Sequence, residues 1–244
     1  IYAFDEISDS FVMAVPEKSD NSLHIAAAAY VENRKDMFYF AHLSNANTTA
    51  SGFITDREAT NVDSKYVRFW CGGLIITDPV SGGRRSISEM GDVLGCVAYS
   101  SKVANEWFSS SGLQRGVVTN SLGVVRNFGS AAAQPERQLL AQRGINCVVN
   151  ADGRVYLTGN FTSQLAQSKL SWANIVMLLL FIQKSLTPTL KRYIEEPNEP
   201  ISWKKLYLEV MPFFKLLETN RAIYKNGWKW EGDQFVSDPQ ECVI

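Results

Sequence analysis

An unbroken apolar run over residues 175–182 dominates the hydrophobic pattern of the chain. It lies within the segment 171–203, SWANIVMLLLFIQKSLTPTLKRYIEEPNEPISW. Because the run is apolar on every side, it predicts a helix that is buried on all faces, or a buried strand. A bilayer span needs about 20 successive apolar residues, whereas polar Asn174 and Gln183 flank this run. The pattern therefore favours a core element over a membrane span.

The apolar run and the residues after it predict four elements: a helix, a strand, a long helix and a final strand. A helix over 171–186 should end at Pro188, and a strand is expected over 190–195. Ser202 is placed to cap a last long helix, and a final strand is expected over 234–237. In the last helix six apolar residues share one stripe, namely Trp203, Leu206, Tyr207, Val210, Phe214 and Leu217. The charged residues Lys204, Lys205, Glu209 and Lys215 lie off that stripe.

The preceding residues alternate between strand-like and helix-like patterns. Strands are predicted over 10–15, 37–43, 65–70, 73–77, 123–128, 145–149 and 155–158, and helices over 20–34, 92–104 and 134–143. The polar stretch 44–63 has the composition of a surface excursion, and Asp152-Gly153 is a strong hairpin signal. The first strand, helix and strand form a βαβ unit, which implies parallel pairing. We predict an α/β protein with mixed sheets flanked by helices.

Composition and charge exclude several classes of protein. The hydrophobic share of 45% and the charged share of 20% are ordinary for a globular protein. The net charge is −1, so no overall field would attract nucleic acid or an anionic membrane. Cys71, Cys96, Cys147 and Cys242 form no C-x-x-C pair, which favours buried free thiols in a reducing compartment. The chain begins at Ile1 without a methionine, so we expect a piece of a longer polypeptide.

The motifs of common enzymes do not occur in the sequence. It contains no G-x-S-x-G, and the segment 81–85, SGGRR, has neither the spacing nor the lysine of a phosphate loop and favours a hairpin turn. His24 and His42 have no His or Cys at i+3 or i+4, so structural roles are expected for both. Adjacent Glu195 and Glu196 would point to opposite faces of the predicted strand. We therefore predict no catalytic, cofactor-binding or metal-binding residues.

Aromatic and basic residues interleave near the C-terminus, where Trp228 and Trp230 alternate with Lys225 and Lys229. Such a pattern can form a stacking surface for single-stranded nucleic acid. No wider basic groove accompanies it, so a packed hairpin or an interface aromatic pair is the favoured interpretation.

Several short segments, in their order and spacing, resemble the tail sheath proteins of contractile bacteriophages. The segment 171–203 carries FIQKS at 181–185 and YIEEPN at 193–198, followed by Trp203. The upstream segments are IITDP at 75–79, RGV at 115–117, RGINCV at 143–148 and RVYLTG at 154–159. The chain departs from the family at Val176-Met177, where many sheath proteins have paired arginines, and at 157–161, where LTGNF replaces W-G-A-R-T. The resemblance extends over nearly the whole chain.

The resemblance implies an architecture and a function. It implies a subtilisin-like α/β domain without catalytic residues over 1–143, followed by a C-terminal α/β sheath domain over 144–244. It further implies a structural subunit of the virion, assembled in the host cytoplasm, that forms hexameric rings stacked helically around the tail tube. Contraction of such a sheath drives the tube through the host envelope. The resemblance also places a tube-facing helix in the second domain, so Lys204, Lys205 and Lys215 are candidate contacts to an acidic tube surface.

Two alternatives stay open. The three lysines can equally form a solvated helix face, and the α/β class also hosts many enzymes, so an enzyme of unknown chemistry is the second functional hypothesis. The enzyme hypothesis predicts a deep pocket with converging titratable groups. The family's terminal arms, which add strands to neighbouring subunits, have no counterpart here, so this chain is expected to be monomeric in solution.

Overall fold

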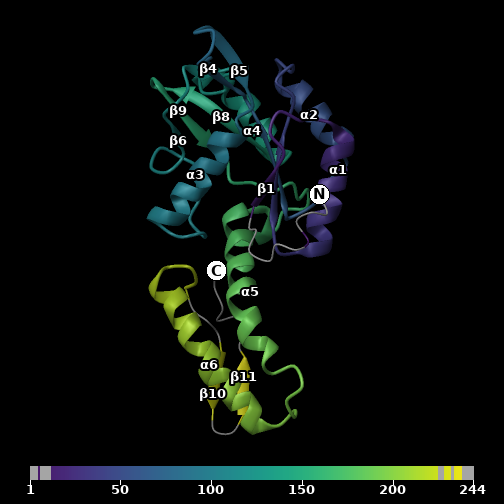
Figure 1. Cartoon of the computed structure of the whole chain (residues 1–244), viewed down its shortest axis with the longest axis vertical. Helices are drawn as coiled ribbons and strands as arrows, with labels where there is room; N and C mark the ends of the chain where they lie inside the picture. Colours follow the sequence, from purple (N-terminus) through teal and green to yellow (C-terminus); the bar gives the residue numbers. More distant parts are fainter. Residues whose placement is uncertain (1–4, 6–11, 225–227, 232–233, 238–244) are drawn as a thin grey trace. The chain divides into compact units, whose positions relative to one another are not determined.

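The computed structural model describes residues 5, 12–224, 228–231 and 234–237. The chain divides into two compact units, Ile1–Leu180 and Phe181–Ile244. Helices and strands alternate through the first unit, and the mixed α/β class predicted from the pattern is confirmed (Figure 1). The predicted domain boundary at residue 143 does not coincide with the boundary between these units. Strands that follow residue 143 belong to the main sheet of the first unit.

Six strands form that main sheet, in the order β1-β2-β3-β8-β9-β6. Their bounds are β1 Val12–Ala14, β2 Phe38–His42, β3 Val67–Cys71, β8 Ile145–Ala151, β9 Arg154–Thr158 and β6 Val117–Val118. The first four strands pair in parallel, as predicted for the βαβ unit, whereas β9 and β6 are antiparallel additions. The β8–β9 turn has positive φ at Asp152 (52°) and Gly153 (71°), which is the geometry of the predicted tight hairpin.

Helices cover both faces of this sheet. One face packs against α1 Asn21–Arg34, α2 Ala50–Ala59 and α4 Gln134–Gln142, and the other packs against α3 Met90–Val103 and the first turns of α5 Ala173–Lys191. Figure 1 shows α1 and α2 on one side of the sheet and α3 on the other. Strand residues alternate between the two layers, so Tyr39 and Phe69 face the first layer and Phe40 and Trp70 face the second. A sheet buried on both faces explains why its strands are almost continuously apolar.

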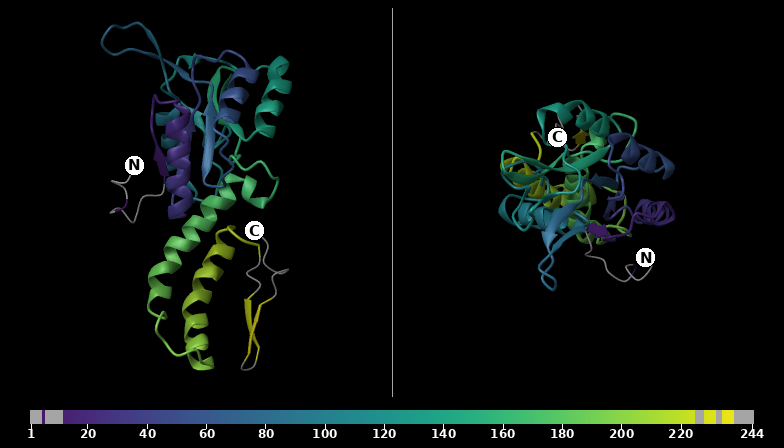
Figure 2. Two further views of the ribbon diagram at one scale, coloured as in Figure 1. Left: turned by 90° about the vertical axis from the view of Figure 1, so that its right-hand side faces the viewer. Right: turned by 90° about the horizontal axis from the view of Figure 1, so that it is seen from above.

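A second sheet of three strands has the order β5-β4-β7, with bounds β4 Leu74–Thr77, β5 Arg84–Ile87 and β7 Gly123–Val124. The turn between β4 and β5 contains the first three residues of SGGRR, whose two arginines begin β5, and Gly82 adopts a φ of 68° there. Asp78 accepts hydrogen bonds from Val80 N and Ser81 Oγ at 3.1 and 2.6 Å. The predicted hairpin turn is confirmed, and Figure 2 shows this hairpin projecting from the first unit.

The predicted surface excursion over 44–63 is wrong in its middle, where α2 forms. Thr49 caps this helix, because its Oγ1 accepts a hydrogen bond from Gly52 N at 3.2 Å. Ala50, Phe53 and Arg57 are buried on one side of α2. Three buried positions among polar residues give a weak helical pattern, which explains why composition alone indicated a loop.

The second unit contains the end of α5, followed by α6 Pro200–Thr219, β10 Trp228–Glu231 and β11 Gln234–Ser237. The rings of Phe181 and Phe213 stack at 6.1 Å between the two helices, and Arg192 forms an ion pair with Glu209 at 3.1 Å. Figure 2 shows the end of α5 and α6 running alongside one another. The two strands pair as an antiparallel hairpin, as predicted around Trp228 and Trp230.

Three predictions around the ends of these helices are wrong. Pro188 does not end α5, which continues to Lys191, and the predicted strand over 190–195 consists of the last helical residues and turns. Proline removes one backbone hydrogen bond and crowds the carbonyl four residues earlier. Pro188 lies only three residues before the end of α5, so little helix follows this disruption. The last helix begins at Pro200 with Glu199 as its N-cap residue, so Ser202 lies inside the helix.

The apolar run is buried on one side only. Ala173, Val176, Met177, Leu178 and Leu180 are buried, whereas later residues of α5 alternate between half-buried and exposed. Within the described residues, α5 alone has the length and composition to cross a membrane, with a mean hydropathy of 1.3. The core helix of a globular protein meets the same criteria. The first turns of α5 pack in the second layer of the first unit, as a core helix does.

Candidate functional site

The three predicted contact lysines lie on the exposed face of α6. Lys204, Lys205 and Lys215 are all exposed, and 11 positions (three helical turns) separate Lys204 from Lys215. Ile201, Leu208 and Leu216 are interspersed with them on this face and are 61%, 61% and 56% exposed. We call the face formed by these six residues the α6 outer face. It combines positive charge with exposed aliphatic surface, a composition suited to contact with another protein rather than to chemistry.

The opposite side of α6 carries the predicted apolar stripe. Leu206, Tyr207, Val210 and Phe214 are half-buried and Leu217 is buried, which confirms the stripe for these five residues. Trp203 differs because it is 45% exposed. Its Nε1 donates a hydrogen bond to Asn198 Oδ1 at 2.7 Å, so Trp203 ties the start of α6 to the preceding turn. Both residues belong to segments that carry the resemblance to sheath proteins.

Inside the first unit, both histidines belong to a buried polar network. His24 Nδ1 lies 2.9 Å from the Tyr39 hydroxyl, and His24 Nε2 lies 3.0 Å from the carbonyl oxygen of His42. His42 Nδ1 lies 3.0 Å from Glu89 Oε1. The side chains of His24, His42 and Glu89 are 1%, 4% and 0% exposed, so no substrate can reach them. The geometry agrees with the structural roles predicted for both histidines.

The two histidines have opposite pKa shifts. Burial lowers the pKa of His24, and the backbone hydrogen bond to His42 offsets this only in part. Burial also opposes protonation of His42, but the hydrogen bond and negative charge of Glu89, with the charge of Glu17, outweigh it and raise the pKa of His42. Glu89 lies 47 positions from His42, so no local spacing in the sequence indicated this pair.

The described cysteines are buried free thiols, as predicted for Cys71, Cys96 and Cys147, whereas Cys242 lies outside the described residues. Cys71 and Cys147 are register partners on β3 and β8, with their sulfur atoms 3.5 Å apart. Burial, followed by the contact with Cys147, raises the pKa of Cys71 well above its usual value. A buried thiol with a raised pKa is a poor nucleophile.

Three surface hollows among the described residues offer no acid–base pair. Hollows of about 420, 280 and 580 Å³ are lined mostly by uncharged residues. Their charged lining residues are Lys169, Arg137 and Asp92 respectively. Among the residues that the structure describes, no three His, Cys, Asp or Glu side chains are grouped to hold a metal ion.

Comparison with known proteins agrees with this geometry. No protein-family model matches the chain. A region of 148 residues, 60% of the chain, is 24% identical to the tail sheath protein of Vibrio phage KVP40 and covers 22% of that protein. The structure matches the contracted helical sheath of the anti-feeding prophage with a TM-score of 0.73 and 16% identity, over 93% of this chain and 59% of that chain. The chain has the fold of a tail sheath protein.

The fold of this chain is also similar to that of a sheath protein from an extracellular contractile injection system. The contracted sheath complex of the extracellular contractile injection system PVC matches with a TM-score of 0.71 and 12% identity, over 94% of this chain and 59% of that chain. The chain thus spans less than two thirds of the length of each of these relatives. The resemblance predicted from short segments is confirmed. These relatives are structural sheath proteins, which agrees with the expectation that the chain is not an enzyme.

Proposed function

We propose that this chain is part of a subunit of a contractile tail sheath, which surrounds the tail tube and contracts to drive it through the host envelope. The observation that supports this most strongly is the match of over nine-tenths of the chain to sheath subunits in assembled, contracted particles. In this role the protein acts through its contacts with other proteins. Its work would come from a change between two packings of the same subunits.

The finer parts of the proposal come from the resemblance. We infer that the first domain is subtilisin-like without catalytic residues, that subunits form hexameric rings stacked helically, and that they assemble in the host cytoplasm before becoming part of the virion. We keep residues 1–143 and 144–244 as the proposed functional domains, although the compact units divide at residue 180. Neither nucleic acid nor a membrane is a proposed partner, which agrees with the net charge of −1.

Electron microscopy of the full-length protein that contains this chain tests the proposed assembly. Purified full-length protein should form hollow tubes with a regular helical repeat when it is concentrated. If the concentrated full-length protein forms only globular particles, the result would argue against a sheath subunit.

The tail tube is the proposed partner of the α6 outer face. Lys204, Lys205 and Lys215 would meet acidic side chains of a tube subunit, while Ile201, Leu208 and Leu216 would supply apolar contact. Charged contacts of this kind raise the rate and specificity of assembly and weaken with salt. A solvated helix face is the alternative, and it predicts no effect of these residues on assembly.

Charge reversal of the lysines distinguishes a contact with the tube from a solvated helix face. Lys204→Glu with Lys205→Glu in the full-length protein should reduce sheath assembly on preformed tubes, measured by cosedimentation and microscopy. The matched control is Lys18→Glu with Lys169→Glu, which makes the same change in net charge at two exposed residues of the first unit. Unchanged assembly of the α6 variant would remove these lysines from the interface.

A further inference from the structure

Cys71 and Cys147 form a pair of thiols at the centre of the main sheet. They are register partners on the parallel strands β3 and β8, and both side chains belong to the core of the first layer. Their sulfur atoms lie 3.5 Å apart. Neighbouring strands are about 4.8 Å apart, which falls within the Cα separation of about 4.4–6.8 Å that a disulfide needs. Joining the two sulfur atoms therefore requires little movement of the backbone.

The two thiols differ in their access to solvent. Cys147 lines the surface hollow of about 280 Å³ that is formed by residues of α4, β8 and β9, whereas Cys71 is not among its lining residues. The exposed fraction is 4% for Cys147 and 0% for Cys71. A small solute that enters the hollow would therefore reach Cys147 before Cys71.

We propose that hydrogen peroxide enters this hollow and oxidises Cys147 and Cys71 to a disulfide that ties β3 to β8. The Cys147 thiolate attacks one peroxide oxygen, the O–O bond breaks, and the departing hydroxide takes up the thiol proton to form water. Cys147 is then a sulfenic acid. The Cys71 sulfur attacks the Cys147 sulfur, the S–O bond breaks, and the Cys71 proton leaves with the hydroxide as a second water. Two thiols are thus oxidised, and one peroxide is reduced to two waters.

The surroundings of the two thiols set the order of these steps. Burial, followed by the contact with Cys147, raises the pKa of Cys71, so Cys71 is a poor first nucleophile. Its sulfur already lies in contact with that of Cys147, so the second step needs no encounter with an outside thiol. This proximity favours the disulfide over further oxidation of Cys147.

The disulfide would join strands that lie far apart in the sequence. Cys71 and Cys147 are 76 positions apart. A link across a loop of this length lowers the unfolding equilibrium constant by up to about a thousandfold, because it restricts the unfolded chain. Oxidation would therefore lock the central strand pair, and this consequence does not depend on the proposed sheath function.

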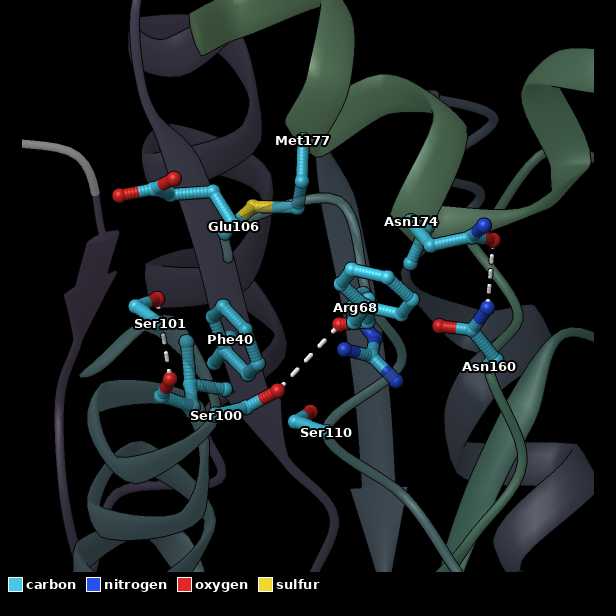
Figure 3. Close-up of a pocket in the computed structure, with 12 residues that line it drawn as sticks. Phe40, Arg68, Ser100, Ser101, Glu106, Ser110, Asn160, Asn174 and Met177 are labelled. Carbon is cyan, nitrogen blue, oxygen red and sulfur yellow. Dashed lines mark hydrogen bonds between the residues drawn. The ribbon is translucent and has the colours of Figure 1, made fainter. Parts of the chain in front are cut away.

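Peptide mapping of the folded wild-type chain after exposure to hydrogen peroxide tests the proposal. We expect one cross-linked pair of peptides containing Cys71 and Cys147, lighter by two hydrogen atoms than the reduced peptides and separated by dithiothreitol. Methionine oxidation is distinguished by mass. Met177, which lines the small cavity beside the buried Arg68 side chain in Figure 3, would gain one oxygen atom instead. In urea, where β3 and β8 separate, the selectivity for this cysteine pair should be lost.

Two variants separate the cysteine pair from thiol oxidation in general. Cys71→Ala should allow Cys147 to proceed to the sulfinic acid. Cys96→Ala is the matched control, because Cys96 is also a buried free thiol and its loss should leave the Cys71–Cys147 link intact. Oxidation should raise the urea midpoint of the wild type and of Cys96→Ala, but not that of Cys71→Ala.

The peptide map of the wild type requires no variant to fold. Two free thiols in the folded chain after peroxide treatment would overturn the proposal. Sulfinic acid at Cys147 of the wild type, or disulfides that join other cysteines, would overturn it as well.

Discussion

The hydrogen bond between His42 and Glu89 links the end of β2 to the residue that precedes α3. Both side chains are buried, so protonation of His42 is coupled to the stability of the fold. A raised pKa means that the folded state binds the proton more tightly than the unfolded chain does. The stabilisation is complete below the unfolded pKa of about 6.5 and is lost as the pH rises through the folded pKa.

Glu89→Gln should reveal this coupling. We expect it to lower the pKa of His42 and to cost about 3–5 kcal/mol of unfolding free energy where His42 is protonated. The difference from wild type should be largest between pH 5.5 and about 6.5 and should shrink above the raised pKa of His42. Urea unfolding at a series of pH values, with the His42 ring followed by NMR, provides the measurement.

The comparison with wild type removes the Glu89 carboxylate and leaves both histidines in place. The chain has two histidines, and His24 has a lowered pKa, so its own contribution to pH dependence has the opposite sign. His24 is present in both proteins, and because burial and, in addition, the charge of His42 lower its pKa, the His24 ring is followed by NMR together with that of His42. A stability difference that stays constant across this pH range would show that Glu89 acts without protonation of His42.

The role of a single residue could be predicted from the sequence where that role depends on residues nearby in the chain. The spacing around His24 and His42 indicated structural roles, and both side chains are buried in a polar network. Their actual partners, Tyr39 and Glu89, come from other elements. The buried Arg68 was not singled out at all, because a charged residue in an apolar strand becomes informative only when its surroundings are known.

At the scale of elements, strong periodicity gave correct predictions and weak periodicity did not. The parallel strands, α1, α3, α4 and the β8–β9 hairpin agree with the predicted ranges to within a few residues. The α2 helix was missed because its cap, Thr49, and its few buried positions lie in a polar stretch. Prolines caused the other errors, since Pro188 and Pro200 lie within helices rather than between them.

The burial of α5 on one side predicts which of its leucines stabilise the fold. Leu180 is 1% exposed and packs in the second layer with Val176 and Met177, whereas Leu190 is 42% exposed. Leu180→Ala should therefore cost about 2–5 kcal/mol of unfolding free energy, because it removes buried contacts and leaves a cavity. Leu190→Ala should change it by less than about 0.5 kcal/mol. Thermal and urea unfolding of both variants compare the two sites.

Similarly small losses at the two sites would mean that the buried side of α5 does not contribute to the core. A large loss at Leu190 alone would instead assign the stabilising contacts of α5 to its part in the second unit, where Phe181 stacks on Phe213.

At the scale of the whole molecule, the order of short segments was more informative than any single one. Segments such as RGINCV and YIEEPN are individually unspecific, but together they indicated the sheath fold that the structural comparison supports. The division into units was harder to predict. β8 is separated from β3 by a long insertion, so nothing local indicates that it enters the same sheet.

The isolated chain is predicted to be monomeric. The resemblance assigns ring contacts to terminal arms that add strands to neighbouring subunits. Sedimentation velocity should give one species of about 27.3 kDa. Stable hexamers or tubes of this chain would contradict the prediction and would place ring contacts within residues 1–244.

The pairing of β3 with β8 in the main sheet also affects how the chain folds during its synthesis. β3 and β8 pair through Cys71 and Cys147, which are 76 positions apart. A ribosome that adds about 5–20 residues per second needs roughly 4–15 s to produce that intervening stretch. Throughout this interval the nascent β3 presents an unpaired apolar edge. We therefore expect newly made chains to be prone to aggregation throughout this interval, which is the stage at which a chaperone that binds apolar strands would act.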